Sequence, residues 1–345
     1  MIEGLRETIL KFVADGKDML PVIVGQENAK RRILASLLAS HHVLIEGPPG
    51  VGKTTLAKHI AAALPPIAVV KDCPYHCQPE NPVCPQCRAR ASGGEALQGI
   101  TIPGEKRFIR LQGSPDLTAE DLLGDIDPTQ AFKYGPQDYR AFVPGKLLKG
   151  NRGIVFFDEL NRVTEKLQNA LLQVLEEGIA TIGPYDVDYP AEFVMIATMN
   201  PRERAGVEEL SDVLLDRFDV AKMSYPESPE RERDILLRHG MRMDSIQISD
   251  EITDTIVALV RATREEPWDK EMDQAASVRA TLSLYEKVQA LAKLDSRQEP
   301  TLNDIREMAP SSLGSRIKPS PESKYYDDPT SLINELVESV MENRK

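Results

Sequence analysis

The 345-residue chain lacks a long apolar run: no stretch approaches the roughly 18 consecutive apolar residues that cross a lipid bilayer. Its first residues, MIEGLRETIL, also lack the basic region and apolar core of a secretory leader. Positive charge is not in excess, since 42 Lys and Arg stand against 54 Asp and Glu, a net charge of -12. We therefore expect a cytoplasmic protein with no membrane span and no global electrostatic attraction for nucleic acid.

Cysteine is absent outside one short segment, where Cys73, Cys77, Cys84 and Cys87 fall within fifteen residues. Such clustering excludes a disulfide framework spread through a secreted fold and indicates one local feature. The surrounding Pro-rich loop has too few apolar residues to fold alone, so a bound metal would organise it. Four thiolates suit a structural tetrahedral Zn²⁺; an iron–sulfur cluster and unmetallated thiols are the alternatives, and His76 could replace one ligand.

The chain length favours two domains, because one domain usually has about 100–200 residues. Apolar runs that end in polar residues, at 42–46, 153–159 and 192–200, predict buried strands of a parallel sheet. Helical patterns over 28–39 and directly after the first run indicate a three-layer α/β domain. From about residue 226 the patterns become helical, which predicts a second, all-α domain.

The segment between the first predicted strand and the helix after it matches the phosphate-binding pattern G-x-x-x-x-G-K-[ST]. It consists of Gly47, Pro48, Pro49, Gly50, Val51, Gly52, Lys53 and Thr54, followed by Thr55. The glycines allow backbone N–H groups to face phosphate oxygens at a helix N-terminus. Lys53 would add charge at the β- and γ-phosphates, and Thr54 can ligate Mg²⁺. The segment therefore predicts ATP and Mg²⁺ as ligands.

Asp158 and Glu159 end a buried apolar run, where carboxylates are costly unless a cation or a catalytic role accounts for them. Nucleotide-bound Mg²⁺ would supply that cation. By role, Asp158 would hold the water shell of the metal, and Glu159 would orient and polarise the attacking water. The alternative interpretation is a plain pair of strand-terminating residues.

Several phrases resemble AAA+ ATPases of the branch that contains the MoxR family and the motor subunits of magnesium chelatase. They are VIVGQENAK, LQGSPDLTAEDLLG, FVPGKLLKGNRGIVFFDELNRVTEKLQNALLQVLEEG, ATMNP, LLDRFD and SVRATLSL, which together extend over nearly the whole chain. The resemblance implies an AAA+ P-loop NTPase domain at 1–225 and a helical lid at 226–318. The remaining residues, 319–345, are expected to form a linker and a C-terminal helix, because 318–328 is polar and Pro-rich and an amphipathic pattern follows at about 329–343. The resemblance also implies a helix-2-type insert at about 112–150 and a pre-sensor-1 hairpin at about 178–193. The residues of that segment favour a hairpin as well, since two alternating runs flank a turn at Gly183-Pro184.

The Cys-rich insertion at about 72–90 departs from one side of this branch. Similar insertions occur in chelatase-like AAA+ proteins, whereas MoxR proteins generally lack them. The phrase SVRATLSL, in contrast, favours the MoxR side. The resemblance alone thus leaves open whether the chain is a chelatase motor or a MoxR-type chaperone.

The resemblance also assigns roles to three further residues. It makes Asn200 sensor 1, Arg217 the arginine finger and Arg279 sensor 2. The alternatives are a turn-forming Asn200, an intrachain ion pair of Arg217 with Asp216 or Asp219, and an ordinary surface arginine at 279. Because a finger in this family acts on the neighbouring subunit, a homo-oligomeric ring is implied, with six subunits expected.

The expected activity is Mg²⁺-dependent hydrolysis of ATP to ADP and phosphate. The resemblance implies a motor that remodels a partner protein or drives metal insertion together with a partner carrying a von Willebrand A domain. Two alternatives remain: a DNA-associated AAA+ motor, and a zinc-stapled scaffold that binds ATP without turnover. Against the DNA motor, 178–193 contains no Lys or Arg, whereas a loop that tracks a nucleic-acid strand should be basic.

Overall fold

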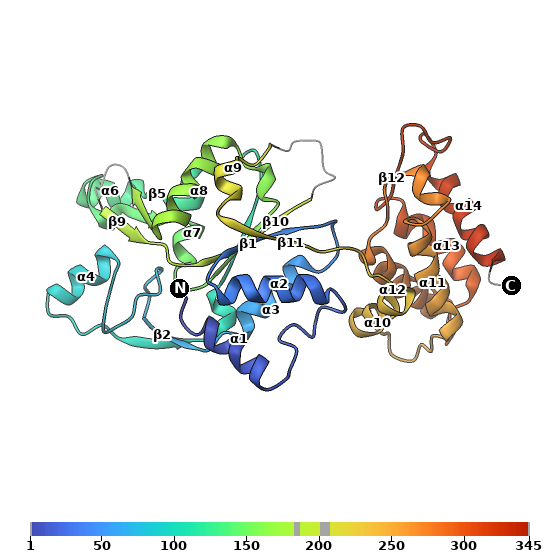
Figure 1. Ribbon diagram of the computed structural model, residues 1–345, viewed down its shortest axis with the longest axis horizontal. Coiled ribbons are helices and arrows are strands. Elements are labelled where there is room, and N and C mark those ends of the chain that lie inside the picture. Colours follow the sequence, from blue (N-terminus) through green and yellow to red (C-terminus); the bar gives the residue numbers. More distant parts are fainter. Residues whose placement is uncertain (1, 183–186, 201–207, 344–345) are drawn as a thin grey trace. The chain divides into compact units, whose positions relative to one another are not determined.

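The computed structural model describes residues 2–182, 187–200 and 208–343 (Figure 1). The chain divides into two compact units. The first comprises residues 1–23, 27–47 and 52–223, and the second comprises 24–26, 48–51 and 224–345. No helix in the described part of the chain combines the length and the apolar character needed to cross a bilayer.

A five-stranded parallel sheet forms the centre of the first unit. Its strand order is β11 (Phe218–Lys222), β1 (His42–Glu46), β10 (Val194–Met199), β7 (Ile154–Asp158) and β4 (Phe108–Gln112). The three sheet strands that the apolar runs predict are confirmed as β1, β7 and β10. The central positions of these three strands are buried, as expected for a parallel sheet covered on both faces.

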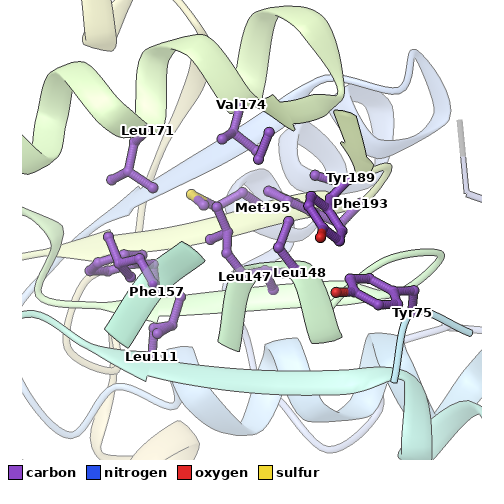
Figure 2. Close-up of a cluster of buried hydrophobic side chains, with 14 of the residues drawn as sticks. Tyr75, Leu111, Leu147, Leu148, Phe157, Leu171, Val174, Tyr189, Phe193 and Met195 are labelled. Atoms are coloured by element: carbon purple, nitrogen blue, oxygen red, sulfur yellow. The ribbon is translucent and has the colours of Figure 1, made fainter. Parts of the chain in front are cut away.

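Helices cover both faces of this sheet, which gives the three layers of the predicted α/β fold (Figure 1). On one side lie α1 (Leu5–Ala14), α2 (Glu27–Leu38) and α3 (Lys53–Ala63); on the other lie α7 (Lys146–Lys149), α8 (Glu165–Glu177) and α9 (Asp212–Leu215). The core under α8 is shown in Figure 2. It is built from side chains of α7, α8 and three strands, which include Leu111, Leu147, Leu148, Phe157, Leu171, Val174 and Met195.

Two long insertions of the first unit have structure of their own. The strands β2 (Ile67–Val70) and β3 (Gly99–Ile102) pair antiparallel and frame the cysteine-containing segment, which includes α4 (Pro85–Ser92). After the short helix η1 (Gly104–Arg107) and β4 come α5 (Ala119–Leu123), β5 (Gly124–Ile126), α6 (Pro128–Tyr134), η2 (Tyr139–Ala141) and β6 (Phe142–Pro144). The strands β5 and β6 pair antiparallel; we call residues 124–144 the β5–β6 insert.

The segment for which a hairpin is predicted contains β8 (Ile179–Ile182) and β9 (Val187–Pro190), which pair antiparallel. The predicted turn at Gly183-Pro184 lies outside the described residues. The connection from β7 to β10 contains Glu159, the short helix η3 (Leu160–Arg162), α8 and then the β8–β9 hairpin.

The described part of the second unit is built mainly from the α-helices α10 (Pro229–His239), α11 (Asp250–Ala262), α12 (Val278–Leu294), α13 (Leu302–Leu313) and α14 (Pro329–Glu342). The start of α10 follows from its sequence, because Ser228 accepts a hydrogen bond from the N–H of Arg231 (3.3 Å) and Pro229 occupies the first turn. The apolar stripe of α11 faces the common core of these helices, where Ile256 and Leu259 are fully buried. The all-α prediction for this part of the chain is confirmed except for one short strand pair.

The segment after residue 318 differs from the linker that the sequence predicts. A short strand, β13 (Lys318–Pro319), pairs antiparallel with β12 (Met272–Gln274), which follows the short helix η4 (Trp268–Glu271). Tyr325 is only 6% exposed and packs in the same core as α14. The polar composition of the segment gave no sign of this packing, because a single buried tyrosine fixes a stretch that is otherwise largely exposed.

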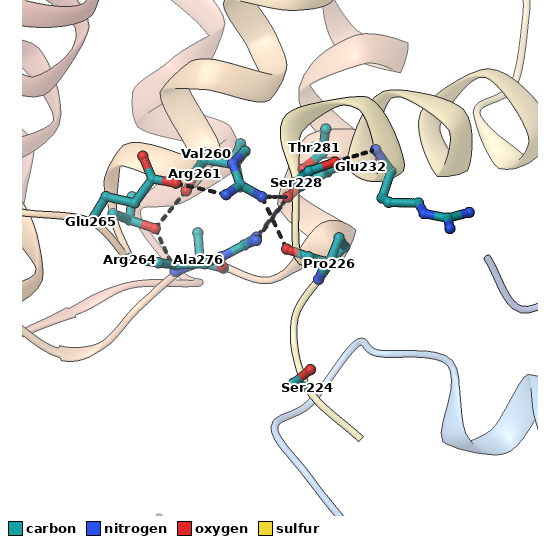
Figure 3. Close-up of polar contacts among 12 residues, drawn as sticks. Ser224, Pro226, Ser228, Glu232, Val260, Arg261, Arg264, Glu265, Ala276 and Thr281 are labelled. Carbon is teal, nitrogen blue, oxygen red and sulfur yellow. Dashed lines mark hydrogen bonds and ion pairs between the residues drawn. The ribbon is translucent and has the colours of Figure 1, made fainter. Parts of the chain in front are cut away.

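A buried carboxylate joins three parts of the second unit (Figure 3). Glu232 of α10 has no exposed surface, and its Oε2 accepts a 2.8 Å hydrogen bond from Nη1 of Arg264. Its Oε1 accepts from Nη2 of Arg264 (3.3 Å) and from Oγ1 of Thr281 on α12 (2.6 Å). Nε of Arg264 donates to the carbonyl of Ala276, just before α12 (2.6 Å). A buried charge of this kind is tolerated because it is paired and fully hydrogen-bonded.

Candidate nucleotide site and cysteine cluster

The predicted phosphate-binding segment forms the turn between β1 and α3. Gly50 and Gly52 have φ values of 80° and 94°, in the left-handed region that favours glycine. Gly52 precedes the first residue of α3, Lys53, so the helix N-terminus opens onto the turn. Nζ of Lys53 donates to the carbonyl of Gly47 across it (2.6 Å). Backbone N–H groups at a helix start, glycine turns and a lysine make a set that fits a phosphate chain.

Gly47 is also constrained by the strand beside it. Its N–H donates to the carbonyl of Met199 (3.2 Å), and a Cβ at this position would lie 2.4 Å from the carbonyl oxygen of Met223. The start of the turn therefore runs too close to neighbouring backbone to accept a side chain. Thr54 and Thr55 lie in the first turn of α3, half-buried and exposed respectively.

The carboxylates of Asp158 and Glu159 lie where β7 ends. Oγ1 of Thr198, on the neighbouring strand β10, donates to Oδ1 of Asp158 (2.8 Å) and accepts the N–H of Glu159 (3.0 Å). The hydroxyl thus fixes both residues. Glu159 itself has left-handed backbone angles, φ 57° and ψ 53°, which turn its side chain out of the alternation of the strand.

Residues of β4 also contact this pair of carboxylates. Nη2 of Arg110 lies 2.7 Å from Oδ2 of Asp158, and Nε2 of Gln112 donates to Oε2 of Glu159 (2.9 Å). Gly113 follows directly and donates its N–H to the carbonyl of Asp158 (2.7 Å). A Cβ on Gly113 would lie 1.9 Å from the carbonyl oxygen of Glu159, so only glycine permits this approach.

Sequence reasoning missed Arg110, Gln112 and Thr198. The sequence offered a partial signal for Gln112, since it is the polar end of the run FIRLQ, as Asp158 is of IVFFD. The register that places Gln112 opposite Asp158 is seen only in the structure. Thr198 is two residues before Asn200 in the phrase ATMNP. Both are short polar positions at the carboxyl ends of parallel strands, where active-site residues of α/β sheets gather.

Asn200 directly follows β10 and is half-buried. The register pairs Glu46 of β1 with Met199 of β10, and Ala197 of β10 with Phe157 of β7. The next residues along these strands, which include Gly47, Asn200 and Asp158, therefore meet at one edge of the sheet. The structure thus brings together Gly47 at the start of the glycine-rich turn, the two carboxylates and Asn200.

Arg217 lies between α9 and β11, outside this group. Its Nη2 is 3.2 Å from Oε1 of Glu176 on α8, so it makes an intrachain ion pair. The partner differs from Asp216 and Asp219, the two acids considered from the sequence; Asp219 is instead 2.9 Å from Nδ1 of His41. Arg279 is the second residue of α12 in the second unit.

The four cysteines gather in one group. The Sγ atoms of Cys73, Cys77, Cys84 and Cys87 all lie within 4.8 Å of one another, and those of Cys73 and Cys84 are 3.9 Å apart. Zn–S bonds of about 2.3 Å in a tetrahedron place sulfur atoms about 3.8 Å apart, so the group fits a Zn²⁺ ion. No disulfide joins the four cysteines, and all are buried.

Backbone N–H groups orient the sulfur atoms. The N–H of Cys84 donates to Sγ of Cys77 (3.3 Å), and the N–H of Cys87 donates to Sγ of Cys84 (3.4 Å). Outer hydrogen bonds of this kind hold metal ligands in place. His76 is not part of the group: its Nδ1 lies 3.1 Å from the carbonyl oxygen of Asn151.

Without a bound cation, the pKa values of the four thiols shift in different directions. Hydrogen bonds from the Cys77 and Cys84 thiols lower the pKa of Cys73. The pKa values of Cys77 and Cys84 are raised, chiefly by their hydrogen bonds to Cys73, and burial raises the pKa of Cys87. Four ionised thiols at these distances require a cation among them.

The parallel sheet, its glycine-rich turn and the carboxylates at the end of β7 define a P-loop NTPase domain, and the second unit is a helical lid. Comparison with known families agrees. Residues 97–220 match the model of the ATPase family associated with various cellular activities (AAA), residues 18–73 match magnesium chelatase subunit ChlI, and residues 272–336 match the AAA lid domain.

Curated relatives match along most of the chain. The magnesium-chelatase subunit ChlI homolog of Methanocaldococcus jannaschii is 27% identical, over 87% of this chain and 85% of the relative. Chaperone MoxR1 of Mycobacterium tuberculosis is 28% identical, over 86% and 72%. The magnesium-chelatase subunit ChlI of Chlorella vulgaris is 28% identical, over 87% and 88%. The chain belongs to the AAA+ ATPases, in the branch of MoxR chaperones and magnesium-chelatase subunits.

Proposed function

We propose that the chain is a Mg²⁺-dependent ATPase that cleaves ATP to ADP and phosphate. The observation that carries the proposal is the meeting of three features at one sheet edge: the turn before Lys53, the paired carboxylates Asp158 and Glu159, and Asn200. The turn from Gly47 to Thr55 would hold the phosphates. Thr54 and Asp158 would hold Mg²⁺, which neutralises charge on the β- and γ-phosphates when bound.

In the proposed reaction a water oxygen bonds to the γ-phosphorus while the bond from that phosphorus to the β,γ-bridging oxygen breaks. Glu159 orients the water and accepts its proton, and ADP leaves with the electron pair of the broken bond. Lys53 offsets charge on the transferred group, and Asn200 positions the water or senses the γ-phosphate. Thr198 supports this chemistry because it fixes the backbone of Glu159 and the carboxylate of Asp158.

Two arginines would complete the site. Arg217 would act on the γ-phosphate of a neighbouring subunit, which requires a ring of identical chains, with a hexamer as the expected size. Its pair with the partly exposed Glu176 is compatible with this role, since an exposed ion pair is worth at most about 1 kcal/mol and exchanges easily. Arg279 at the start of α12 would report nucleotide state to the lid.

The four cysteines would hold one Zn²⁺ with a structural role. The closed set of four buried sulfur donors supports zinc, because structural zinc sites leave no open position for substrate. An iron–sulfur cluster would use the same ligands, and elemental analysis of the purified protein separates the two.

For the process that ATP hydrolysis drives, we propose a class of function and no particular client. Relatives on both sides of the branch are similar to this chain, and their names describe a chaperone and subunits of a chelatase. We propose that the chain remodels a partner protein or drives metal insertion in the cytoplasm, together with a partner carrying a von Willebrand A domain. The absence of Lys and Arg from 178–193 argues against work on nucleic acid.

ATP binding and turnover of two variants test the proposal. Lys53→Ala should lose nucleotide affinity, and Glu159→Gln should bind ATP but lose turnover by about 10²-fold or more, as expected for a lost catalytic group. Lys58→Ala, at an exposed position of the same helix, is the control and should match the parent. Unchanged turnover in Glu159→Gln would leave only a nucleotide-binding scaffold.

Mixing two inactive proteins tests the composite site. Arg217→Ala subunits keep Glu159, and Glu159→Gln subunits keep Arg217, so a mixed ring contains some interfaces with both groups intact. Partial recovery of ATPase activity on mixing is the expected result. If activity stays at the level of the separate variants while mixed rings form, Arg217 does not act across the interface.

A further inference from the structure

The loop that carries the four cysteines packs against two other elements of the first unit, the β8–β9 hairpin and the β5–β6 insert. Tyr75, between Cys73 and Cys77, is fully buried, and its ring stacks on that of Tyr189 in β9, with centroids 5.6 Å apart and planes 27° apart (Figure 2). The ring of Tyr189 also contacts Phe142 of β6, with centroids 4.6 Å apart. A single row of aromatic rings thus joins the cysteine loop, the β8–β9 hairpin and the β5–β6 insert.

Asn151 makes a second connection between the loop and the hairpin. Its side chain is buried; Nδ2 donates to the carbonyl of Tyr75 (2.6 Å), and Oδ1 accepts the N–H of Glu192, two residues after β9 (2.9 Å). One amide therefore fixes the backbone of the loop and the backbone of the exit from the hairpin. Removing either partner would leave a buried polar group without its hydrogen bond.

The insert has its own link to the cluster. Nε2 of Gln86, on the helix that begins after Cys84, donates to the carbonyl of Tyr139 in η2 (3.2 Å). Cys84 and Cys87 belong to the same buried core as Phe142. The cluster is therefore bonded to the insert at one side and stacked against the hairpin at the other.

The loop cannot hold this arrangement through its own core. Between β2 and β3 the chain contains few buried apolar side chains other than the cysteines and Tyr75. Tyr75 lies between two of the sulfur donors, so binding a metal through Cys73 and Cys77 fixes its backbone on both sides. Metal-bound loops of this kind owe their order to the metal, because ligand binding and local folding are one equilibrium.

We propose that the four-cysteine site is a brace, in which bound Zn²⁺ sets the position of the β8–β9 hairpin and the β5–β6 insert through Tyr75 and Asn151. This rests on the zinc assignment made above but not on ATP hydrolysis. The hairpin and the insert then act as one mechanical unit with the cysteine loop. Metal occupancy therefore changes how these two elements are presented to a partner.

Hydrogen exchange read by mass spectrometry tests the brace. Purified protein is assayed for zinc and iron, and exchange is compared before and after metal removal by a strong zinc chelator under native conditions. We expect about one zinc per chain, and amide exchange at 187–193 and 139–144 that becomes at least about tenfold faster without metal, whereas α11 and α12 stay as protected as before. Equal exchange at 187–193 with and without zinc would overturn the brace.

A variant that keeps the metal separates the brace from the zinc site. Tyr75→Leu retains all four cysteines but loses the ring that stacks on Tyr189, so zinc content should stay at about one per chain while exchange at 187–193 rises. Tyr326→Leu, at a half-exposed tyrosine of the second unit, is the control. If Tyr75→Leu exchanges like the parent, the aromatic contact does not transmit order. Protein without zinc or iron would refute the metal site and leave the ATPase proposal intact.

Discussion

Nε2 of Gln112 donates a 2.9 Å hydrogen bond to Oε2 of Glu159, which joins the end of β4 to the carboxylate proposed to polarise water. The same oxygen lies 3.2 Å from Nε of Arg162, three residues further along the chain. Glu159 is therefore held by one hydrogen bond and one ion pair from its own subunit. Both contacts engage Oε2, so together they limit how far the carboxylate can turn.

The first prediction concerns this contact. Gln112→Ala removes the amide donor and leaves the backbone at the end of β4 in place, so Glu159 is freer to reach the water. Since one such hydrogen bond is worth about 1 kcal/mol, basal ATP turnover should rise about fivefold with little change in KM for ATP. Steady-state ATPase assays at several ATP concentrations measure both. A fall in kcat would mean that Gln112 supports the active position of Glu159.

A second prediction follows from Gly113. In Gly113→Ala the new Cβ would lie 1.9 Å from the carbonyl oxygen of Glu159, so β4 and β7 have to separate at their carboxyl ends. Overpacking of this kind costs about 1–3 kcal/mol of folding stability, and it should also lower ATP turnover because Glu159 moves. Chemical denaturation and ATPase assays check the two effects.

The matched control for this change is Gly93→Ala at the end of α4. A Cβ there would approach no atom closer than 3.4 Å, and the residue has φ of -75°, which alanine adopts readily. Stability and turnover should stay close to those of the parent. If Gly113→Ala were as mild as Gly93→Ala, the close contact between β4 and Glu159 would not exist in solution.

The third prediction tests the buried carboxylate of the second unit. Arg264→Met keeps most of the side-chain volume but removes the nearer of the two arginines paired with Glu232, whose carboxylate is completely buried (Figure 3). The other, Arg261, remains with its Nη1 3.8 Å from Oε2 of Glu232. Loss of one partner of a buried pair costs about 3–5 kcal/mol, which thermal or denaturant unfolding should detect. Arg306→Met breaks an exposed pair with Glu338 and should cost less than about 1 kcal/mol.

The sheet and the phosphate-binding turn could be predicted because each rests on local sequence. The run 42–46 ends in the glycine turn, and β1 has the bounds that the apolar pattern gives. The edge strand β4 was missed, because FIRLQ alternates polar and apolar residues within a Gly- and Pro-rich region. The strand β4 contributes to the site through its pairing with β7, and the paired residues Gln112 and Asp158 are 46 positions apart in the sequence.

The site residues, too, include some that the sequence predicts and some that only the structure reveals. Asp158 and Glu159 could be assigned because charge at the end of an apolar strand is conspicuous in a sequence. The roles of Thr198 and Gln112 depend on register between strands that are not consecutive, which no local pattern specifies. The ion pair of Arg217 with Glu176 likewise joins α8 to the residue after α9, and only the packed structure brings them together.

The last prediction is a loss of stability in acid that originates at His42. Its Nδ1 accepts the N–H of Met195 (3.0 Å), and its ring lies 6.2 Å and 6.0 Å from the rings of Phe193 and Phe218. Burial among these groups lowers the pKa of His42 to about 4, whereas in the unfolded chain it is about 6.5. Between these pH values His42 is protonated in the unfolded chain but neutral in the folded chain. Folding stability therefore falls as the pH drops from about 6.5 to about 4.

Because the ring is partly exposed, His42 should account for about 1–3 kcal/mol of this loss. His42→Asn keeps a hydrogen-bond acceptor for Met195 but does not titrate, so its unfolding free energy should fall less between pH 7 and pH 5 than that of the parent. The comparison of the two slopes removes the contribution of carboxylates, which both proteins share. His239→Asn, at an exposed position of α10, controls for loss of an imidazole. Equal slopes for His42→Asn and the parent would show that His42 is not the group that limits stability in acid.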